Sequence, residues 1–278
     1  MKFTRLLFIM GASLAAAVGC SEEVSLDFHK EGNCWQMSQA QFDKFAKKLS
    51  KASPEEADAL IDRVYTIADS LSAAEQDGTF IVFADAMEHT FYQVDSPLRN
   101  DDLYLRVLDR EGRCNSLMST DYRRIDWKEH ILRANAVGSE VVDLPVSDIN
   151  GEETSLHRLL DEQTVLLVYG EDCKACTKLM NEAVNSSRFK KAAEDGQLRL
   201  LSLYIGEDGE EFAAKSAVLK DWANFIDARQ LVRYENAFDS RLVPSLYLIS
   251  DKKMVKVKGT LSVSEIEKAL DAPALYSA

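Results

Sequence analysis

The chain has 278 residues, enough for one large domain or two ordinary ones. Hydrophobic residues make up 46% of it, as in a globular protein, and its formal net charge is −13. This charge argues against nucleic acid as a partner, because the sequence offers no basic stripe that could neutralise phosphates.

Residues 1–19 are interpreted as a signal peptide and not as part of the fold. Lys2 and Arg5 precede an apolar run at 6–14, which is too short to span a membrane and is typical of a secretory signal. Small residues then lead directly to Cys20, which resembles a bacterial lipobox, where the cysteine is lipidated and becomes the first residue. We therefore expect a lipid anchor on Cys20, with ordinary signal cleavage nearby as the alternative.

A helical domain is predicted at 38–137, after a lipidated tether at 20–37 that carries few regular signals. A capping box at 38–41 and the sequence Ser-Pro-Glu-Glu at 53–56 mark two helix starts. Apolar residues recur every three or four positions after both signals. The pattern predicts helices at 38–49, 54–71, 78–92, 103–108 and 122–134.

The pattern changes near residue 138, and 138–278 is predicted to be an α/β domain. Residues 141–146 alternate like a strand, and Asn150-Gly151 is a hairpin signal. Continuous apolar runs are expected of strands that are buried on both faces. Further strands are therefore predicted at 165–169, 198–205, 245–249 and 254–257, with a last helix that begins at Ser262.

Cys173-Lys174-Ala175-Cys176 lies between the strand predicted at 165–169 and a helical segment. A dithiol at a helix start has one acidic sulfur, because unpaired N–H groups and the helix dipole stabilise a thiolate there. A zinc site would need two further ligands, and the four histidines lack the spacing of a zinc finger. We therefore expect no metal and no cofactor.

Val243-Pro244 stands directly before the apolar strand at 245–249. Together with the dithiol, this proline resembles the thioredoxin fold, in which a cis-proline at a strand start packs against the CxxC motif. The resemblance covers about residues 139–274. The order of parts is similar to that of the membrane-anchored TlpA/ResA-type thioredoxins.

The resemblance implies thiol–disulfide exchange with protein thiols and disulfides of the cell envelope. Cys173 would be the attacking thiolate, and Cys176 would resolve the mixed disulfide. Pro244 would shape the substrate groove, and Val243 would supply backbone hydrogen bonds to the substrate.

The dithiol also departs from the family pattern. Lys174-Ala175, which we expect to border the substrate, replace the usual Gly-Pro, and Asp172 replaces the usual Trp. Lys174 would favour a thiolate on the first cysteine, whereas Asp172 would oppose it. Leu167 and Leu179 stand where related proteins carry an acid, so no proton acceptor is evident beside the second cysteine except Glu182 as a candidate.

The segment Asp-Ser-Pro-Leu-Arg-Asn-Asp-Asp-Leu-Tyr at 95–104 resembles a motif in helical domains of unknown function. Those domains precede thioredoxin domains in lipoproteins of Bacteroidetes. The start Cys-Ser-Glu-Glu at 20–23 is similar to the acidic signal that sends such lipoproteins to the cell surface; the alternative is a solvated tether. The resemblance implies an outer-membrane lipoprotein that faces the periplasm or the cell surface.

Cys34 and Cys114 form a second pair of cysteines in a chain that is predicted to be exported. A disulfide between them would close a loop of about 80 residues and stabilise the helical domain by about 4 kcal/mol through the unfolded state. The alternatives are two unpaired thiols, or a thiol that relays electrons to the dithiol.

The leading hypothesis is an exported, lipid-anchored thiol–disulfide oxidoreductase. The alternative is a binding lipoprotein of the cell envelope. It would use the thioredoxin fold as a scaffold and the helical domain as its recognition surface, with little redox turnover.

Overall fold

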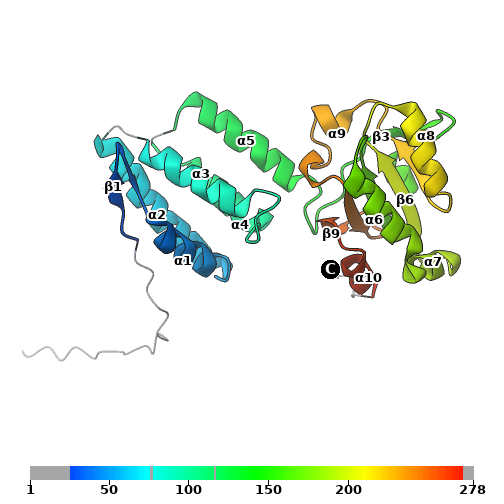
Figure 1. Ribbon diagram of the computed structural model, residues 1–278, viewed down its shortest axis with the longest axis horizontal. Coiled ribbons are helices and arrows are strands. Elements are labelled where there is room, and N and C mark those ends of the chain that lie inside the picture. The colour runs from blue at the N-terminus through cyan, green and yellow to red at the C-terminus, as the bar shows by residue number, and fades with distance from the viewer. Residues whose placement is uncertain (1–25, 76–77, 116, 272–278) are drawn as a thin grey trace, which may run out of the picture.

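The computed structural model describes residues 26–75, 78–115 and 117–271. A mainly helical domain comes first, a domain built on a mixed sheet follows, and α5 (Ser119–Arg133) runs from the first toward the second (Figure 1). The predicted signal peptide and the predicted lipidation site Cys20 lie outside the described residues. Within the described ranges, no helix combines the length and the apolar character that a membrane span needs.

The helical domain confirms the predicted helix starts. Ser38 accepts a hydrogen bond from the backbone N–H of Gln41, and Ser53 accepts one from Glu56. The fourth and fifth helices are longer than predicted, since Asn100 already caps the fourth through the backbone N–H of Leu103. Besides α5, the helices are α1 (Gln39–Leu49), α2 (Pro54–Glu75), α3 (Thr79–Phe91) and α4 (Asp101–Glu111).

The helical domain starts earlier than predicted, because residues 29–36 form a hairpin. Its strands β1 (His29–Glu31) and β2 (Cys34–Gln36) pair antiparallel, and the backbone N–H of Trp35 donates to Thr79 at 2.7 Å. Leu26 and Met37 are 8% exposed and belong to the core of the domain. The prediction of a tether at 20–37 is therefore wrong from residue 26 onward. Strands of three residues are too short to give a periodic signal.

Aromatic rings fill the core of the helical domain. The ring of Phe83 lies 5.2 Å from that of Tyr65 and 6.0 Å from that of Phe42, and both pairs meet edge to face. Such pairs contribute about 0.5–1.5 kcal/mol each beyond the area that they bury.

A charged side chain also lies in this core. Glu111 is fully buried; it accepts a hydrogen bond from the Tyr65 hydroxyl at 2.7 Å and lies 3.4 Å from the guanidinium of Arg124. Burial raises the pKa of Glu111 to about 7, because loss of water outweighs the hydrogen bond and the nearby positive charges. Lys128, which is paired with Glu88, has its pKa lowered by the same cause.

The second domain confirms the predicted α/β class. Among the residues that the structure describes, its sheet has the order β4-β3-β7-β6-β5-β8-β9. The central strand β5 pairs parallel with β6 and antiparallel with β8. The strands are β3 (Pro145–Ser147), β4 (Glu153–Ser155), β5 (Thr164–Tyr169), β6 (Arg199–Tyr204), β7 (Ala223–Ile226), β8 (Ser245–Ile249) and β9 (Val255–Thr260).

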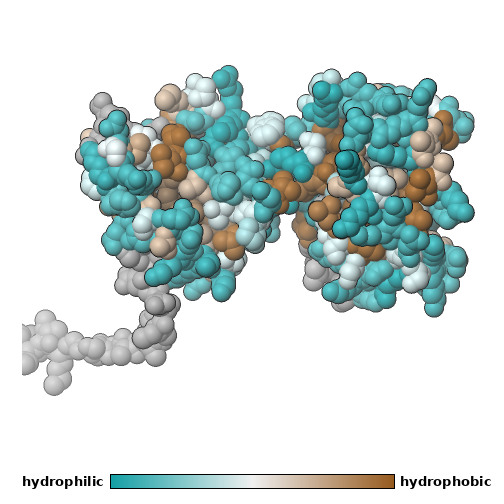
Figure 2. Space-filling view, in the orientation of Figure 1, coloured by the Kyte–Doolittle hydropathy of each residue, from teal (hydrophilic) through white to brown (hydrophobic). Residues whose placement is uncertain are grey.

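Both faces of this sheet are covered. Val165, Leu167 and Tyr169 of β5 share one core cluster with residues of the helices, whereas Leu166 and Val168 pack on the other face with residues from 141–160 and 232–238. Hydrophilic side chains dominate the visible outer surface (Figure 2). The helices are α6 (Lys174–Asn185), α7 (Ser187–Glu194), α8 (Gly209–Val218), α9 (Leu231–Tyr234) and α10 (Val263–Leu270), and short 3-10 turns are η1 (Leu156–Leu159) and η2 (Ser240–Leu242).

The strand predicted at 141–146 is wrong except at its end. Val141 and Leu144 are both buried, which does not fit the period of two of a strand because they stand three positions apart, and their segment joins no strand ladder. The backbone N–H of Val141 donates instead to the carbonyl of Lys253 at 2.8 Å. The hairpin predicted at Asn150-Gly151 is confirmed, because β3 and β4 pair across it.

We predict that Glu111→Gln removes a pH dependence of stability. A carboxyl whose folded pKa is raised from 4.5 to about 7 contributes stability below pH 4.5 that is lost as the pH rises through 7. The wild type should therefore lose up to about 3 kcal/mol relative to the variant over this window. Urea unfolding at a series of pH values measures the difference. The exposed variant Glu194→Gln is the control; parallel curves for wild type and Glu111→Gln would contradict the prediction.

Candidate active site

The two cysteines of the CxxC motif form a disulfide where β5 leads into α6. Their Cα atoms lie 5.1 Å apart. Cys173 caps α6, since its sulfur accepts a hydrogen bond from the backbone N–H of Cys176 at 3.0 Å. Cys173 is half-buried and Cys176 is 0% exposed. In the reduced form, the first sulfur is thus the one that the helix start can stabilise as a thiolate and that a substrate can reach.

Apolar side chains surround the buried sulfur. Leu167 and Leu179, which occupy the two positions considered for an acid, belong to the same core cluster as Cys176. Because apolar surroundings disfavour a charge, a thiolate is less stable on Cys176 than on Cys173.

The other predicted substrate residues lie on two elements at the same end of the sheet. Val243-Pro244 is a cis peptide bond directly before β8; Val243 is half-buried and Pro244 is buried. A Cβ atom on Gly170 would meet the side chain of Val243 at 3.6 Å, so the segment before β8 lies beside the loop before Cys173. Lys174 and Ala175 are exposed in the first turn of α6.

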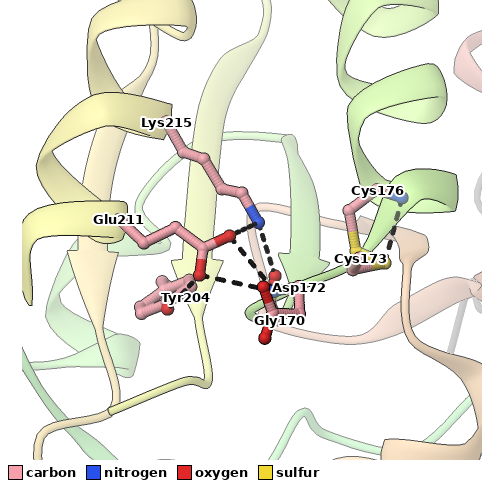
Figure 3. Close-up of a disulfide and its surroundings, with 7 residues drawn as sticks. All are labelled: Gly170, Asp172, Cys173, Cys176, Tyr204, Glu211 and Lys215. Atoms are coloured by element: carbon pink, nitrogen blue, oxygen red, sulfur yellow. Dashed lines mark hydrogen bonds and ion pairs between the residues drawn. A yellow bond between two sulfur atoms is a disulfide. The ribbon is translucent and has the colours of Figure 1, made fainter. Parts of the chain in front are cut away.

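The loop between β5 and α6 is held from one side by α8 (Figure 3). Asp172 has a φ of +48°, in the left-handed region, and its backbone N–H donates to both carboxylate oxygens of Glu211 at 3.2 and 3.4 Å. Lys215 donates to the carbonyl of Gly170 at 2.7 Å. These bonds hold the residue that precedes Cys173 in a conformation that non-glycine residues seldom adopt.

Glu211 and Lys215 support each other as well as the loop. They form an ion pair one helical turn apart, with exposed side-chain fractions of 23% and 12%. The hydroxyl of Tyr204 donates to Glu211 at 3.3 Å, and burial raises the pKa of Tyr204. The sequence shows the pair only as a common helical spacing, so its contact with a loop 39 residues away was not predicted.

The charges around Cys173 are mixed, with more acids than bases. Glu171 and Asp172 are exposed directly before it, and Lys174 is exposed directly after it. The carboxylate of Glu171 accepts a hydrogen bond from the backbone N–H of Glu207 at 3.2 Å. Glu207, in the loop after β6, is thus a further acid beside the loop that leads to Cys173. The acids oppose a thiolate and the lysine favours it.

The predicted bridge between Cys34 and Cys114 is wrong, because both are free thiols. Cys34 lies in β2 beside Gly78, whereas Cys114 is buried after α4 and accepts a hydrogen bond from Arg110 at 3.0 Å. Burial raises the pKa of the Cys114 thiol to about 11. Loop-closure entropy acts on the unfolded chain, whereas a disulfide also needs the two cysteines to lie close together in the folded one.

The described part of the chain brings together no group of three or more His, Cys, Asp or Glu side chains that could hold a metal ion. We take the dithiol, with Glu211 and Lys215 beside it, as the candidate site.

Comparison with known proteins follows the division into two domains. Residues 30–135 match the family described as a domain of unknown function, DUF5106. The whole structure resembles that of a thioredoxin-like protein from Bacteroides caccae, with a TM-score of 0.74 and 20% identity over 83% of this chain and 82% of that chain. No curated protein matches the chain.

Two further structures resemble the sheet domain more loosely. One is the C-terminal domain of an uncharacterized protein from Bacteroides fragilis, with 24% identity and a TM-score of 0.47 over 50% of this chain and 99% of that chain. The other is the thioredoxin domain of a thiol-disulfide oxidoreductase from Bacteroides vulgatus, with 14% identity and a TM-score of 0.39 over 49% of this chain and 99% of that chain. Identities this low show the fold alone. The chain thus combines a region that matches DUF5106 with a thioredoxin-like fold, as the segment at 95–104 and the CxxC motif with Pro244 predict.

Proposed function

We propose that the protein is an exported, lipid-anchored thiol–disulfide oxidoreductase that acts on protein thiols and disulfides of the cell envelope. The observation that carries the proposal is the Cys173–Cys176 disulfide at the start of α6, with the first sulfur accessible and the second buried. This asymmetry gives the two cysteines different roles in exchange.

Exchange in the oxidised form starts when a substrate thiolate attacks the sulfur of Cys173. A bond forms between these two sulfurs while the bond to Cys176 breaks, and the thiolate left on Cys176 takes up a proton. A second substrate thiolate then attacks the substrate sulfur of the mixed disulfide and displaces Cys173. The substrate loses two electrons and the dithiol gains them; the reverse sequence reduces a substrate disulfide.

We place the substrate peptide between the segment that precedes β8 and the first turn of α6. Val243 and Pro244 border it on one side, and the exposed Lys174 and Ala175 border it on the other. Backbone groups next to the accessible sulfur suit recognition of an extended peptide whose sequence varies.

We predict that Cys173→Ser abolishes the acceleration by the protein of insulin reduction with dithiothreitol, because the attacking sulfur is lost. Cys176→Ser should instead accumulate a mixed disulfide that non-reducing mass spectrometry detects. Cys34→Ser is the control and should keep wild-type activity. A wild type that does not accelerate insulin reduction, and with a Cys173 pKa near the value of about 8.5 for free cysteine, would favour the alternative of a binding lipoprotein.

We predict that Glu211→Gln lowers the pKa of Cys173 and makes the dithiol easier to reduce. The change removes a negative charge near the thiolate and leaves Lys215 as an unpaired positive one. Thiolate absorbance against pH and redox equilibrium with glutathione measure the two effects. Glu210→Gln, which changes an exposed acid on the same helix, is the matched control; equal shifts in both variants would refute a specific role for Glu211.

The anchor and the location are proposals that rest on the N-terminal sequence pattern. The cysteine at 20 would carry the lipid, and the protein would be held in the outer membrane, facing the periplasm or the cell surface.

We predict that Cys20→Ala releases the protein from the membrane fraction and abolishes labelling with radioactive palmitate. Fractionation of cells that express the wild type and the variant measures both effects, with Cys34→Ser again as the control. Retention of the label in Cys20→Ala would contradict the lipid anchor. Protease treatment of intact cells then distinguishes the two faces of the membrane.

A further inference from the structure

The helical domain contacts the sheet domain directly before the proline segment, which we define as residues 239–244. His130 of α5 hydrogen bonds with the carbonyl of Glu235 at 2.9 Å. Asn135, which is 1% exposed, donates to the carbonyl of Ala237 at 2.7 Å. Two backbone positions just ahead of the proline segment are therefore tied to the end of the helical domain.

Arg241 of the proline segment extends these contacts. Its guanidinium lies 3.7 Å from the centre of the Tyr92 ring, and it also donates to the Tyr92 carbonyl at 3.5 Å. Two further bonds, of 2.9 and 2.6 Å, join the guanidinium to the carboxylate of Asp239, which is nearly fully buried. A guanidinium that stacks on an aromatic ring and forms a bidentate ion pair with a carboxylate has little freedom to move.

Tyr92 is itself held by the interior of the helical domain. It is 3% exposed, and its ring lies 5.0 Å from that of Tyr104. The ammonium of Lys128 lies 5.3 Å from the centre of the Tyr92 ring and pairs with Glu88. The surface that receives Arg241 is thus a fixed part of the helical core.

A second cation reinforces the same contact from the sheet. Lys258 of β9 donates to the carbonyl of Leu132 at 2.8 Å and lies 3.6 Å from the carboxylate of Asp101. Arg99 holds that carboxylate with bonds of 2.8 and 3.1 Å. Arg99, Asp101 and Tyr104 all come from the segment at 95–104, so this sequence motif supplies much of the contact between the domains.

On its other side the proline segment lies beside β9 and the loop between β5 and α6. Gly259 has a φ of +63°, and a Cβ atom there would lie 2.6 Å from the side chain of Leu242. Val243 contacts the position of Gly170, three residues before Cys173. The segment is short, so a shift of Arg241 would move Val243, two residues further on.

We propose that the helical domain serves to hold the proline segment in place beside the dithiol, with Arg241 as the positioning residue. The proposal rests on the proposed function and gives the domain of unknown function a part in it. Binding of an extended protein substrate needs the segment in position, whereas attack on a small disulfide needs only the accessible sulfur. Loosening the contact therefore weakens the first reaction and spares the second.

The test compares Arg241→Ala and Tyr92→Leu with the wild type in steady-state reduction of insulin and in reaction with oxidised glutathione. We expect KM for insulin to rise about tenfold in both variants, the change that corresponds to about 1.4 kcal/mol of lost contact energy, with the glutathione rate unchanged. Tyr92→Phe keeps the ring and should behave as the wild type. The matched control Arg188→Ala removes an exposed arginine paired with Asp271, away from the segment.

Amide hydrogen exchange makes the outcome independent of catalysis. Arg241→Ala and Tyr92→Leu should speed exchange in residues 239–243 while the strands keep wild-type protection. If the wild type reduces no insulin but this local change appears, the proposed function fails and the positioning role stands. Unchanged exchange in 239–243, a KM equal to that of Arg188→Ala, or a parallel loss of the glutathione reaction overturns the positioning role.

Discussion

The position of one sulfur at the start of α6 is the constraint on which the candidate site depends. Cys173 caps the helix directly after a residue in the left-handed region, Asp172, whose backbone N–H is held by the carboxylate of Glu211. Because β8 lies next to β5 in the sheet, Val243, which stands just before β8, lies beside the loop that precedes Cys173. The geometry around Cys173 thus depends on contacts from three separate elements.

Buried and half-buried charges recur wherever this protein has to fix a geometry. Glu111 meets Arg124 inside the helical domain, Arg241 meets Asp239 at the domain contact, and Lys215 meets Glu211 behind the dithiol loop. Removing such groups from water costs free energy that offsets most of their attraction. We interpret them as devices that select one arrangement of neighbouring elements, while the aromatic and aliphatic cores supply the stability.

The sequence predicted what depends on local pattern and missed what depends on distant contacts. Helix caps at Ser38 and Ser53, and long apolar runs such as that of β5, are visible in a few adjacent residues. The three-residue strands β1 and β2 are too short to show a period. Glu211 contacts the loop before Cys173 only because the fold brings α8 next to that loop. A Cys34–Cys114 bridge would need the two sulfurs to lie close together, which spacing along the chain does not show.

The core of the helical domain begins only a few residues after Cys20, which limits how far the folded protein could lie from a lipid on that cysteine. Only six residue steps separate Cys20 from Leu26, so this stretch spans at most about 20 Å when fully extended. Figure 1 shows β1 at the end of the helical domain that faces away from the sheet domain. A lipid on Cys20 would therefore place the helical domain next to the bilayer and the sheet domain, with its dithiol, on the far side of it.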